Sequence, residues 1–142
     1  TPVDDDEVEL SYFREVELAA GSGGRKIEFN DSRKLRFSRR TLDRMGIQVR
    51  NAACVTVSGN SMEPVMPNGS TVGVDTGNTI LIDGDIYALG HHGCLRVKIV
   101  YALPWGGIRL KSFNSSEWPD ETYDSLDDIK ILGRVFWYSA LI

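Results

Sequence analysis

The stretch DIYALGHHGCLRVKIVY, residues 85–101, decides most of what the sequence indicates about the fold. Two runs of apolar, β-branched and aromatic residues flank the triplet HHG at 91–93, a combination that is typical of a tight turn. The pattern predicts a β-hairpin that pairs residues 85–90 with residues 94–101. The second run also contains Lys98, whose ammonium group is costly to bury unless it is paired or neutral.

Outside this hairpin, the chain consists mostly of short strand-like runs bounded by turn residues. The further runs cover residues 54–58, 71–75, 107–113 and 129–138. One short helix is predicted from Arg39 to Met45, because Ser38 can cap its start and Gly46 can end it. These elements predict a mainly β domain of many short strands, which is closer to a small barrel than to a flat sheet.

The N-terminal part has a different composition. Residues 1–9 are acidic and almost free of apolar side chains, which is typical of a tail or the end of a linker. Residues 10–20 contain strand formers but lead into the glycine-rich stretch 19–24, which favours an exposed, deformable segment. We therefore expect residues 1–24 to be a flexible linker and residues 25–142 to be the folded domain.

Length and charge limit the classes of function. A chain of 142 residues suits one domain with a core of its own. The net charge is −4 and no block of Lys or Arg occurs, so direct binding to nucleic-acid phosphates is not expected. Since no apolar run reaches the roughly 18 to 20 residues of a membrane span and no signal peptide is visible, we expect a cytoplasmic protein without a membrane anchor.

Cysteine and histidine give no sign of a metal or cofactor site. Cys54 and Cys94 both lie in apolar runs and are expected to be buried free thiols in a reducing compartment. His91 and His92 are adjacent, and no second group of ligands accompanies them. We therefore expect neither a metal ion nor a cofactor.

The chemistry is indicated by a serine and a lysine. Ser61 lies in VSGNSMEP, residues 57–64, where an apolar run breaks into a turn, and Lys98 follows 37 residues later. Each is weak evidence alone, because serine is common in turns and a strand lysine usually points outward, here on the same face as Arg96. Together they fit a hydrolase in which a neutral lysine takes the proton of a serine nucleophile.

Other nucleophile patterns fit less well. The sequence around Ser61 lacks the closing glycine of a nucleophile elbow, and Pro64 stands where penicillin-binding enzymes have a lysine. A Ser-His-Asp triad would need His91 or His92, which lie in a turn without an obvious carboxylate to orient them.

The motifs resemble those of one family. Residues 58–62, SGNSM, are similar to the Ser-Gly-x-Ser-Met signature of the LexA, UmuD and lambda-type repressor autopeptidases. Residues 84–87 and 95–98 resemble the Gly-Asp strand and the lysine strand of that family, and residues 16–21 resemble the Ala-Gly self-cleavage segment of its repressors. The resemblance covers about residues 16–138, although the 40 residues from Gly21 to Ser61 are more than we would expect for the family.

The resemblance implies a C-terminal regulatory domain of a transcriptional repressor, with a DNA-binding domain before Thr1 that reaches the operator. In that family Lys98 would deprotonate Ser61, which would attack Ala20 and cut the Ala20–Gly21 bond. The backbone N–H groups of Asn60 and Ser61 would bind the oxyanion. A RecA–single-stranded DNA filament would stimulate the cleavage after DNA damage.

The resemblance also implies a homodimer, for which the apolar C-terminal stretch 135–142 is a candidate interface. Two alternatives share the motifs: a UmuD-like subunit of a translesion polymerase, and a dimerisation module with a vestigial site. A signal peptidase is less consistent with the sequence, because no membrane anchor accompanies the serine and lysine.

Overall fold

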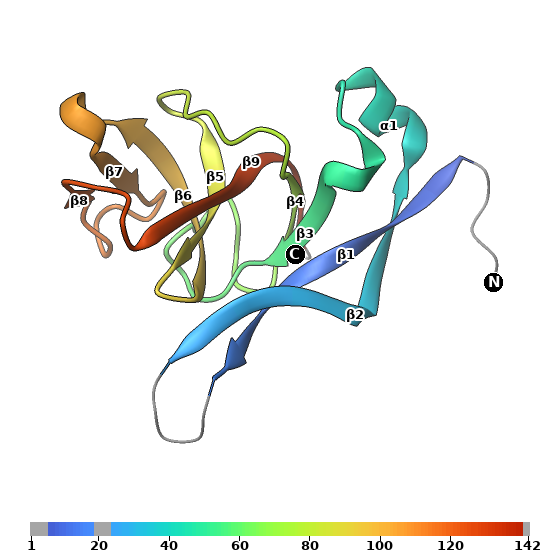
Figure 1. Ribbon diagram of the computed structural model, residues 1–142, viewed down its shortest axis with the longest axis horizontal. Coiled ribbons are helices and arrows are strands. Elements are labelled where there is room, and N and C mark those ends of the chain that lie inside the picture. Colours follow the sequence, from blue (N-terminus) through green and yellow to red (C-terminus); the bar gives the residue numbers. More distant parts are fainter. Residues whose placement is uncertain (1–5, 19–23, 141–142) are drawn as a thin grey trace.

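The computed structural model of this chain describes residues 6–18 and 24–140 (Figure 1). These residues form a mainly β domain with one short helix, as the sequence predicts. The strands are β1 (Glu7–Glu17), β2 (Arg25–Ser38), β3 (Ala52–Thr56), β4 (Thr71–Asp75), β5 (Ile86–His91), β6 (Cys94–Ala102), β7 (Ile108–Lys111), β8 (Glu121–Tyr123) and β9 (Ile129–Ser139), and the helix is α1 (Arg39–Arg44). Short 3-10 turns cover Val49–Asn51 and Pro104–Gly106.

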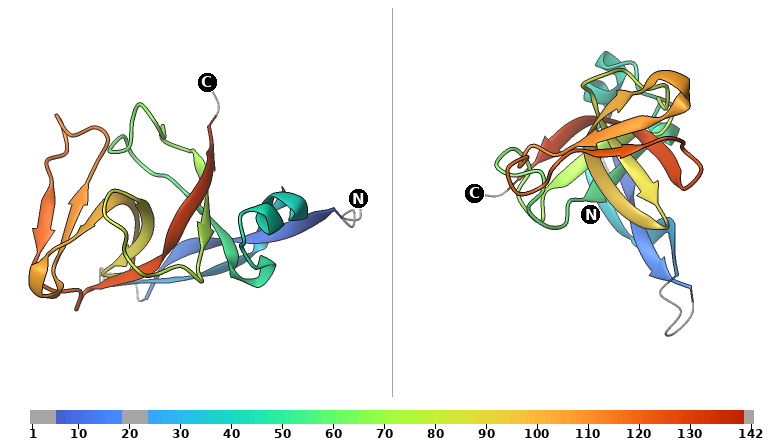
Figure 2. Two further views of the ribbon diagram at one scale, coloured as in Figure 1. Left: turned by 90° about the horizontal axis from the view of Figure 1, so that it is seen from above. Right: turned by 90° about the vertical axis from the view of Figure 1, so that its left-hand side faces the viewer.

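All nine described strands belong to one sheet in the order β2-β1-β3-β4-β9-β5-β6-β7-β8. The sheet curls strongly, yet β2 and β8 lie at its two edges, so it is an open curved sheet and not a closed barrel (Figures 1 and 2). Apolar clusters cover both faces of the β5–β6 hairpin, with Val97 and Ile99 in one and Tyr87 and Val100 in the other. Burial on both faces explains why β6 lacks an alternating pattern in the sequence.

The hairpin predicted for residues 85–101 is present. Strands β5 and β6 pair antiparallel, and His91 lies opposite Cys94 across a two-residue turn. His92 and Gly93 have φ angles of 52° and 78°, the left-handed geometry that tight hairpin turns require. A Cβ atom on Gly93 would lie 1.9 Å from the carbonyl oxygen of Arg25, so glycine also lets the start of β2 pack on this turn.

The predicted helix is also present. Helix α1 begins after Ser38, whose hydroxyl accepts a hydrogen bond from the backbone N–H of Thr41 at 3.2 Å. Gly46, with a φ angle of 71°, follows the last turn. Leu42 anchors the helix, because its side chain is fully buried.

The N-terminal region differs from the expectation. Residues 7–9, predicted to be part of a polar tail, open strand β1, and the linker expected for residues 1–24 therefore contains a strand of the main sheet. Val8, Leu10 and Tyr12 alternate along β1 and are buried, while the residues between them are more exposed. Strand β2, which was not predicted from the sequence, pairs with β1 along its length. The glycine-rich part of the predicted cleavage segment, residues 19–23, lies outside the described residues.

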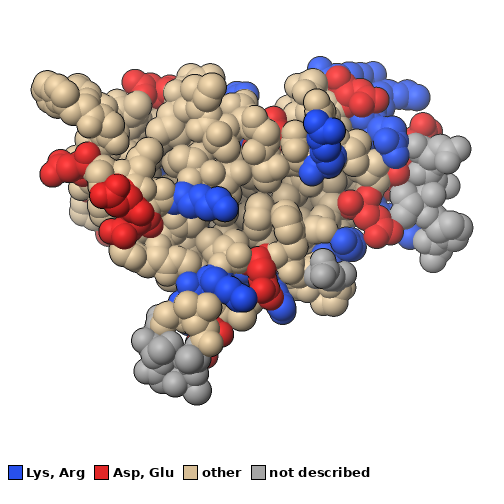
Figure 3. Space-filling view, in the orientation of Figure 1, with Lys and Arg blue, Asp and Glu red and all other residues tan. Residues whose placement is uncertain are grey.

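The surface and the cysteines agree with the bulk composition. Lys and Arg side chains are interspersed with Asp and Glu on the face shown in Figure 3, without one large basic surface. Among the described residues, no helix is long and apolar enough to cross a membrane. Both cysteines are free thiols, but only Cys54 is fully buried, and burial raises its pKa to about 12; Cys94 is half-buried.

Candidate active site

Ser61 lies in the turn that joins β3 to β4. The side chains of Met62 and Met66 anchor this turn in the core, with exposed fractions of 1% and 0%. The backbone N–H of Gly59 donates to Asn68 Oδ1 at 2.8 Å, which closes the turn across nine residues. Ser61 itself is half-buried, so its hydroxyl sits at the boundary between core and solvent.

Lys98 lies in the middle of β6 and is almost fully enclosed, with 3% of its surface exposed. Its Nζ donates a hydrogen bond to Ser112 Oγ at 2.7 Å. Burial lowers the pKa of this amine to about 8, and the positive charge of Arg96 adds to the effect. A substantial fraction of the lysine is therefore neutral near physiological pH.

Ser61 and Lys98 line the same cleft of about 180 Å³. The cleft lies between the end of β3, the Ser61 turn and β6, and Trp118 forms part of its wall. The part of the chain that the structure describes contains no hydrogen bond between Ser61 and Lys98. The fold thus brings both predicted residues to one site, with the lysine bonded to Ser112.

The turn after β7 holds the Ser61 turn in place. Trp118 Nε1 donates to Asn60 Oδ1 at 2.8 Å, and Asn60 Nδ2 donates to Glu117 Oε2 at 2.8 Å. The backbone N–H of Asn114 donates to the carbonyl of Ser61 at 3.0 Å. These contacts fix the backbone on both sides of the serine carbonyl.

These supporting residues were not predicted from the sequence. The stretch SFNSSEW, residues 112–118, has the composition of an ordinary polar loop. Its one distinctive residue is Trp118, whose ring centroid lies 5.7 Å from Lys98 Nζ. An aromatic residue in a polar loop was the available signal, but no spacing rule connects it to a serine 57 residues earlier.

The backbone N–H groups of Asn60 and Ser61 have no hydrogen-bond partner among the described residues. Two neighbouring N–H groups that are free to donate are a suitable site for a negatively charged oxygen. An oxyanion contact at Asn60 and Ser61 stays a prediction, and no protein group among the described residues occupies the two donors.

The two histidines lie elsewhere. Neither His91 nor His92 lines the cleft that contains Ser61. The Nδ1 atom of His91 lies 3.1 Å from Arg96 Nη1, and His92 Nε2 lies 3.9 Å from Asp128 Oδ2. Within the described residues, no three side chains of the metal-binding types gather into a site. The geometry therefore does not favour a Ser-His-Asp triad.

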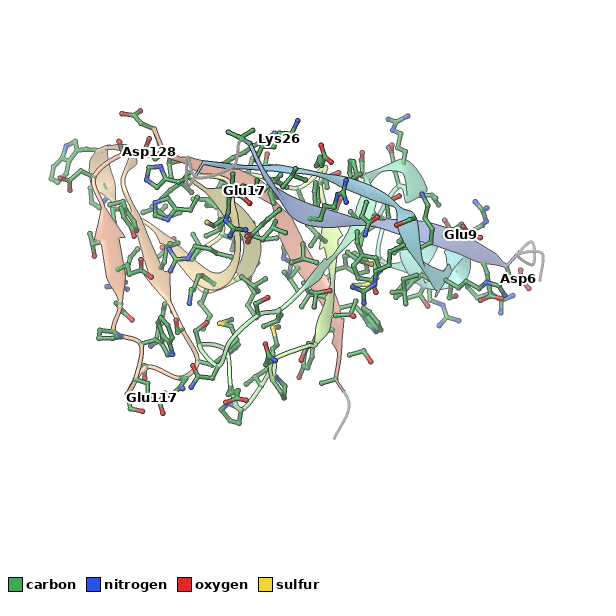
Figure 4. All side chains as sticks on the ribbon, turned by 90° about the horizontal axis from the view of Figure 1, so that it is seen from below. Asp6, Glu9, Glu17, Lys26, Glu117 and Asp128 are labelled. Carbon is green, nitrogen blue, oxygen red and sulfur yellow. The ribbon has the colours of Figure 1, made fainter. Side chains whose placement is uncertain are left out.

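The β1–β2 hairpin ends away from the Ser61 turn. Figure 4 shows Glu17, Lys26 and Asp128 together at one side of the molecule and Glu117, whose carboxylate binds Asn60, at the other. The hairpin is fixed to β6 by a hydrogen bond from the backbone N–H of Leu95 to Glu15 Oε2 at 2.8 Å. A separate cleft of about 450 Å³ lies at this end and contains neither Ser61 nor Lys98.

Comparison with known proteins identifies the class. Residues 12–136 match the family model described as Peptidase S24-like, and the chain belongs to this family. It is 52% identical over 145 residues to the HTH-type transcriptional regulator PrtR of Pseudomonas aeruginosa and 44% identical over 143 residues to the repressor protein CI of Enterobacteria phage phi80. The alignments cover 99% of this chain but only 57% and 60% of those two proteins. The chain therefore spans somewhat more than half the length of the regulator and the repressor that it matches.

Proposed function

We propose that this chain is the regulatory domain of a transcriptional repressor and that it cuts itself between Ala20 and Gly21 through Ser61 and Lys98. The observation that carries the proposal is the shared cleft, which is lined by a half-buried serine and by a buried lysine with a pKa of about 8. Membership of the S24 peptidase-like family supports a serine peptidase of this kind.

In the proposed reaction, the neutral amine of Lys98 takes the proton of Ser61 Oγ, and the oxygen attacks the carbonyl carbon of Ala20. The N–H groups of Asn60 and Ser61 stabilise the negative oxygen of the tetrahedral intermediate. When the Ala20–Gly21 bond breaks, the lysine ammonium gives its proton to the leaving amine of Gly21. Water then hydrolyses the acyl-serine ester by the same route and restores Ser61.

We further propose that movement of the β1–β2 hairpin limits this reaction. Glu17 and Lys26, which are close to the end of the hairpin, lie on the far side of the molecule from Glu117 and the Asn60 side chain that it binds (Figure 4). Since Ala20 is only three residues after Glu17, the proposed reaction requires this end of the hairpin to move towards the cleft before the serine can attack. A partner that binds preferentially to the conformation with the cleavage segment at the cleft increases the population of that conformation and so accelerates cleavage. The partner that the family resemblance implies is a RecA–single-stranded DNA filament.

The repressor as a whole is proposed to be a homodimer that binds operator DNA through a preceding domain. One relative is named an HTH-type transcriptional regulator, and this chain matches only 57% of its length. Residues 135–139 of β9 pair with β4 on one side, while β5 covers only residues 129–134 on the other. The exposed edge of residues 135–139 is the proposed site of two-fold pairing.

The two relatives also favour a repressor over a UmuD-like polymerase subunit, because they are a transcriptional regulator and a phage repressor. A dimerisation module with a vestigial site is distinguished by activity alone. In that case the chain self-associates but remains uncut at every pH.

The test is to incubate the 142-residue chain between pH 6 and pH 10 and to follow the products by mass spectrometry. The expected product begins at Gly21, and the rate rises with pH. The Ser61→Ala variant abolishes the product, whereas the control Ser125→Ala, an exposed serine outside the cleft, leaves it unchanged. A chain that stays intact, or that is cut at another bond, contradicts the proposal.

A further inference from the structure

Arg96 lies two residues before Lys98 on β6 and lines the same cleft. Residues two apart on a strand project from the same face, so the guanidinium and the amine share one side of the sheet. The proposed cleavage reaction gives this arginine no role. Its contacts nevertheless fix a permanent positive charge next to a lysine that has to lose its own charge.

Glu121 on β8 holds the guanidinium with both carboxylate oxygens. Arg96 Nη1 donates to Glu121 Oε1 at 3.1 Å, and Nη2 donates to Oε2. Tyr123 OH donates to Oε1 of the same carboxylate. The side chains of Arg96 and Glu121 are only 21% and 34% exposed, so this two-point contact is partly shielded from water.

His91 completes the contacts of the arginine without adding a charge. Its Nδ1 lies 3.1 Å from Arg96 Nη1, and a guanidinium can only donate hydrogen bonds. Nδ1 must therefore accept, which places the proton of a neutral imidazole on Nε2. Burial, followed by the charges of Arg96 and His92, lowers the pKa of His91 and keeps it neutral near pH 7.

The elements around Lys98 thus contribute two opposite charges. Arg96, on the same strand as Lys98, is positive, and Glu121 on β8 is negative. His91 on β5 and Tyr123 on β8 are neutral near pH 7. The segment after β7 contributes the hydroxyl of Ser112 and the ring of Trp118. Arg96 lowers the pKa of Lys98 and Glu121 raises it, and the arginine has the larger effect.

We propose that Arg96 is a positioning residue of the Ser61–Lys98 reaction: Glu121 fixes its guanidinium beside the lysine, where its permanent positive charge favours the neutral amine. This inference rests on the function proposed above, and it deepens that function by naming a fixed charge that, in addition to burial, favours the unprotonated form of the general base. It has a specific consequence. Removing the positive charge of Arg96 must raise the pKa of Lys98, and removing the negative charge of Glu121 must lower it.

The test compares charge-removing variants of the 142-residue chain. Arg96→Gln moves the midpoint of the pH–rate curve upward by about one pH unit, which makes cleavage about tenfold slower below the midpoint. Glu121→Gln moves the midpoint downward, because the arginine charge is no longer compensated. Arg96→Lys keeps the charge and retains a midpoint close to that of the original chain.

Matched controls come from a second ion pair, in which Arg109 Nε lies 3.9 Å from Asp120 Oδ2. Arg109→Gln and Asp120→Asn make the same changes in net charge but remove no residue that lines the cleft. Both are expected to leave the midpoint unchanged. Equal shifts in these controls and in the Arg96 and Glu121 variants overturn the proposal.

A measurement without cleavage separates this inference from the proposed function. In a Ser61→Ala background, NMR titration of the Lys98 side chain reports the pKa of its amine directly, and Lys98→Met identifies the signal. Opposite shifts for Arg96→Gln and Glu121→Gln support the inference even if the original chain never cuts itself. Shifts in the same direction, or none, overturn it even if cleavage is observed.

Discussion

The buried amine of Lys98 donates a hydrogen bond to the hydroxyl of Ser112 at 2.7 Å, and each of these residues has only 3% of its surface exposed. The contact orients the amine within the cleft from the segment that follows β7. It also gives a buried ammonium an acceptor, which lowers the cost of the charged state in the folded protein.

Self-cleavage should increase with pH through a midpoint near 8, the pKa to which burial lowers Lys98. The rate rises because the neutral amine accumulates as the pH passes this value, and it levels off above it. Lys98→Arg should not cleave at any pH up to 10, since guanidinium stays protonated. A midpoint near 10.4, the ordinary value for lysine, would mean that the amine is hydrated when it reacts.

Lys98→Met should stabilise the fold at neutral pH. Well below pH 8, Lys98 is protonated in the folded and in the unfolded protein, so the folded state carries the full cost of the buried ammonium. Between pH 8 and about 10.4 the unfolded state keeps a proton that the folded state has lost, so the stability of the lysine form rises with pH. The advantage of methionine should therefore shrink by about 3 kcal/mol over this range.

Urea unfolding of the Lys98→Met chain and its parent, both with Ser61→Ala to prevent cleavage, measures this difference at pH 7 and pH 10.5. Other titrating groups affect the two chains equally and cancel. An advantage of methionine that does not change with pH would show that the folded-state pKa of Lys98 is not lowered.

Ser112→Ala should reduce both stability and cleavage. Without the hydroxyl, the amine of Lys98 loses the acceptor at 2.7 Å, at a cost of about 1–3 kcal/mol in unfolding free energy. The protonated form of Lys98 becomes less favourable, so the midpoint of the pH–rate curve moves to lower pH. The maximum rate above the midpoint falls, because the amine is less well oriented. Ser125→Ala is the matched control, and an unchanged plateau for Ser112→Ala would show that the hydrogen bond does not orient the base.

Trp118→Phe should slow cleavage several-fold and cost about 1 kcal/mol of stability. The substitution retains an aromatic wall for the cleft but removes the Nε1–H that donates to Asn60 Oδ1 at 2.8 Å. The backbone next to Ser61 is then less firmly held. Trp105→Phe changes a tryptophan that is 98% exposed and serves as the control for rate and for denaturation midpoint.

Tyr138→Lys should dissociate the proposed homodimer. Tyr138 is 47% exposed near the end of β9, so a lysine there can be accommodated in the monomer. Phe136 is a poorer choice, because its ring packs edge-on against Phe37 with the centroids 5.8 Å apart. Sedimentation equilibrium should give about twice 15.8 kDa for the original chain and 15.8 kDa for the variant.

The control for the dimer is Thr122→Lys, an exposed position on the edge strand β8. It places the same charge on an edge strand that is separated from β9 by β5, β6 and β7, and it should leave the dimer intact. A chain that is monomeric at 100 micromolar, or a Tyr138→Lys chain that remains dimeric, would contradict the interface on β9.

Local sequence patterns were sufficient to predict the elements whose structure depends on residues that are close together in the sequence. The β5–β6 hairpin follows from its turn residues and its two apolar runs, and helix α1 follows from the cap at Ser38 and the glycine at position 46. Strand β2 was not predicted, because its many charged residues hide the pairing that β1 provides. The acidic composition of residues 7–9 likewise suggested a tail, although the chain there pairs with the end of β2.

The sequence by itself determined a mainly β domain, the hairpin with its lysine, and Ser61 and Lys98 as a pair of candidates. These features depend on residue type and short-range spacing, which the sequence contains directly. Only the tertiary structure decided that both side chains line one cleft, that Ser112 and Trp118 surround the amine, and that Glu121 fixes Arg96 beside it. Contacts between residues 14 to 58 positions apart depend on the register and curvature of the sheet, and no local preference specifies those.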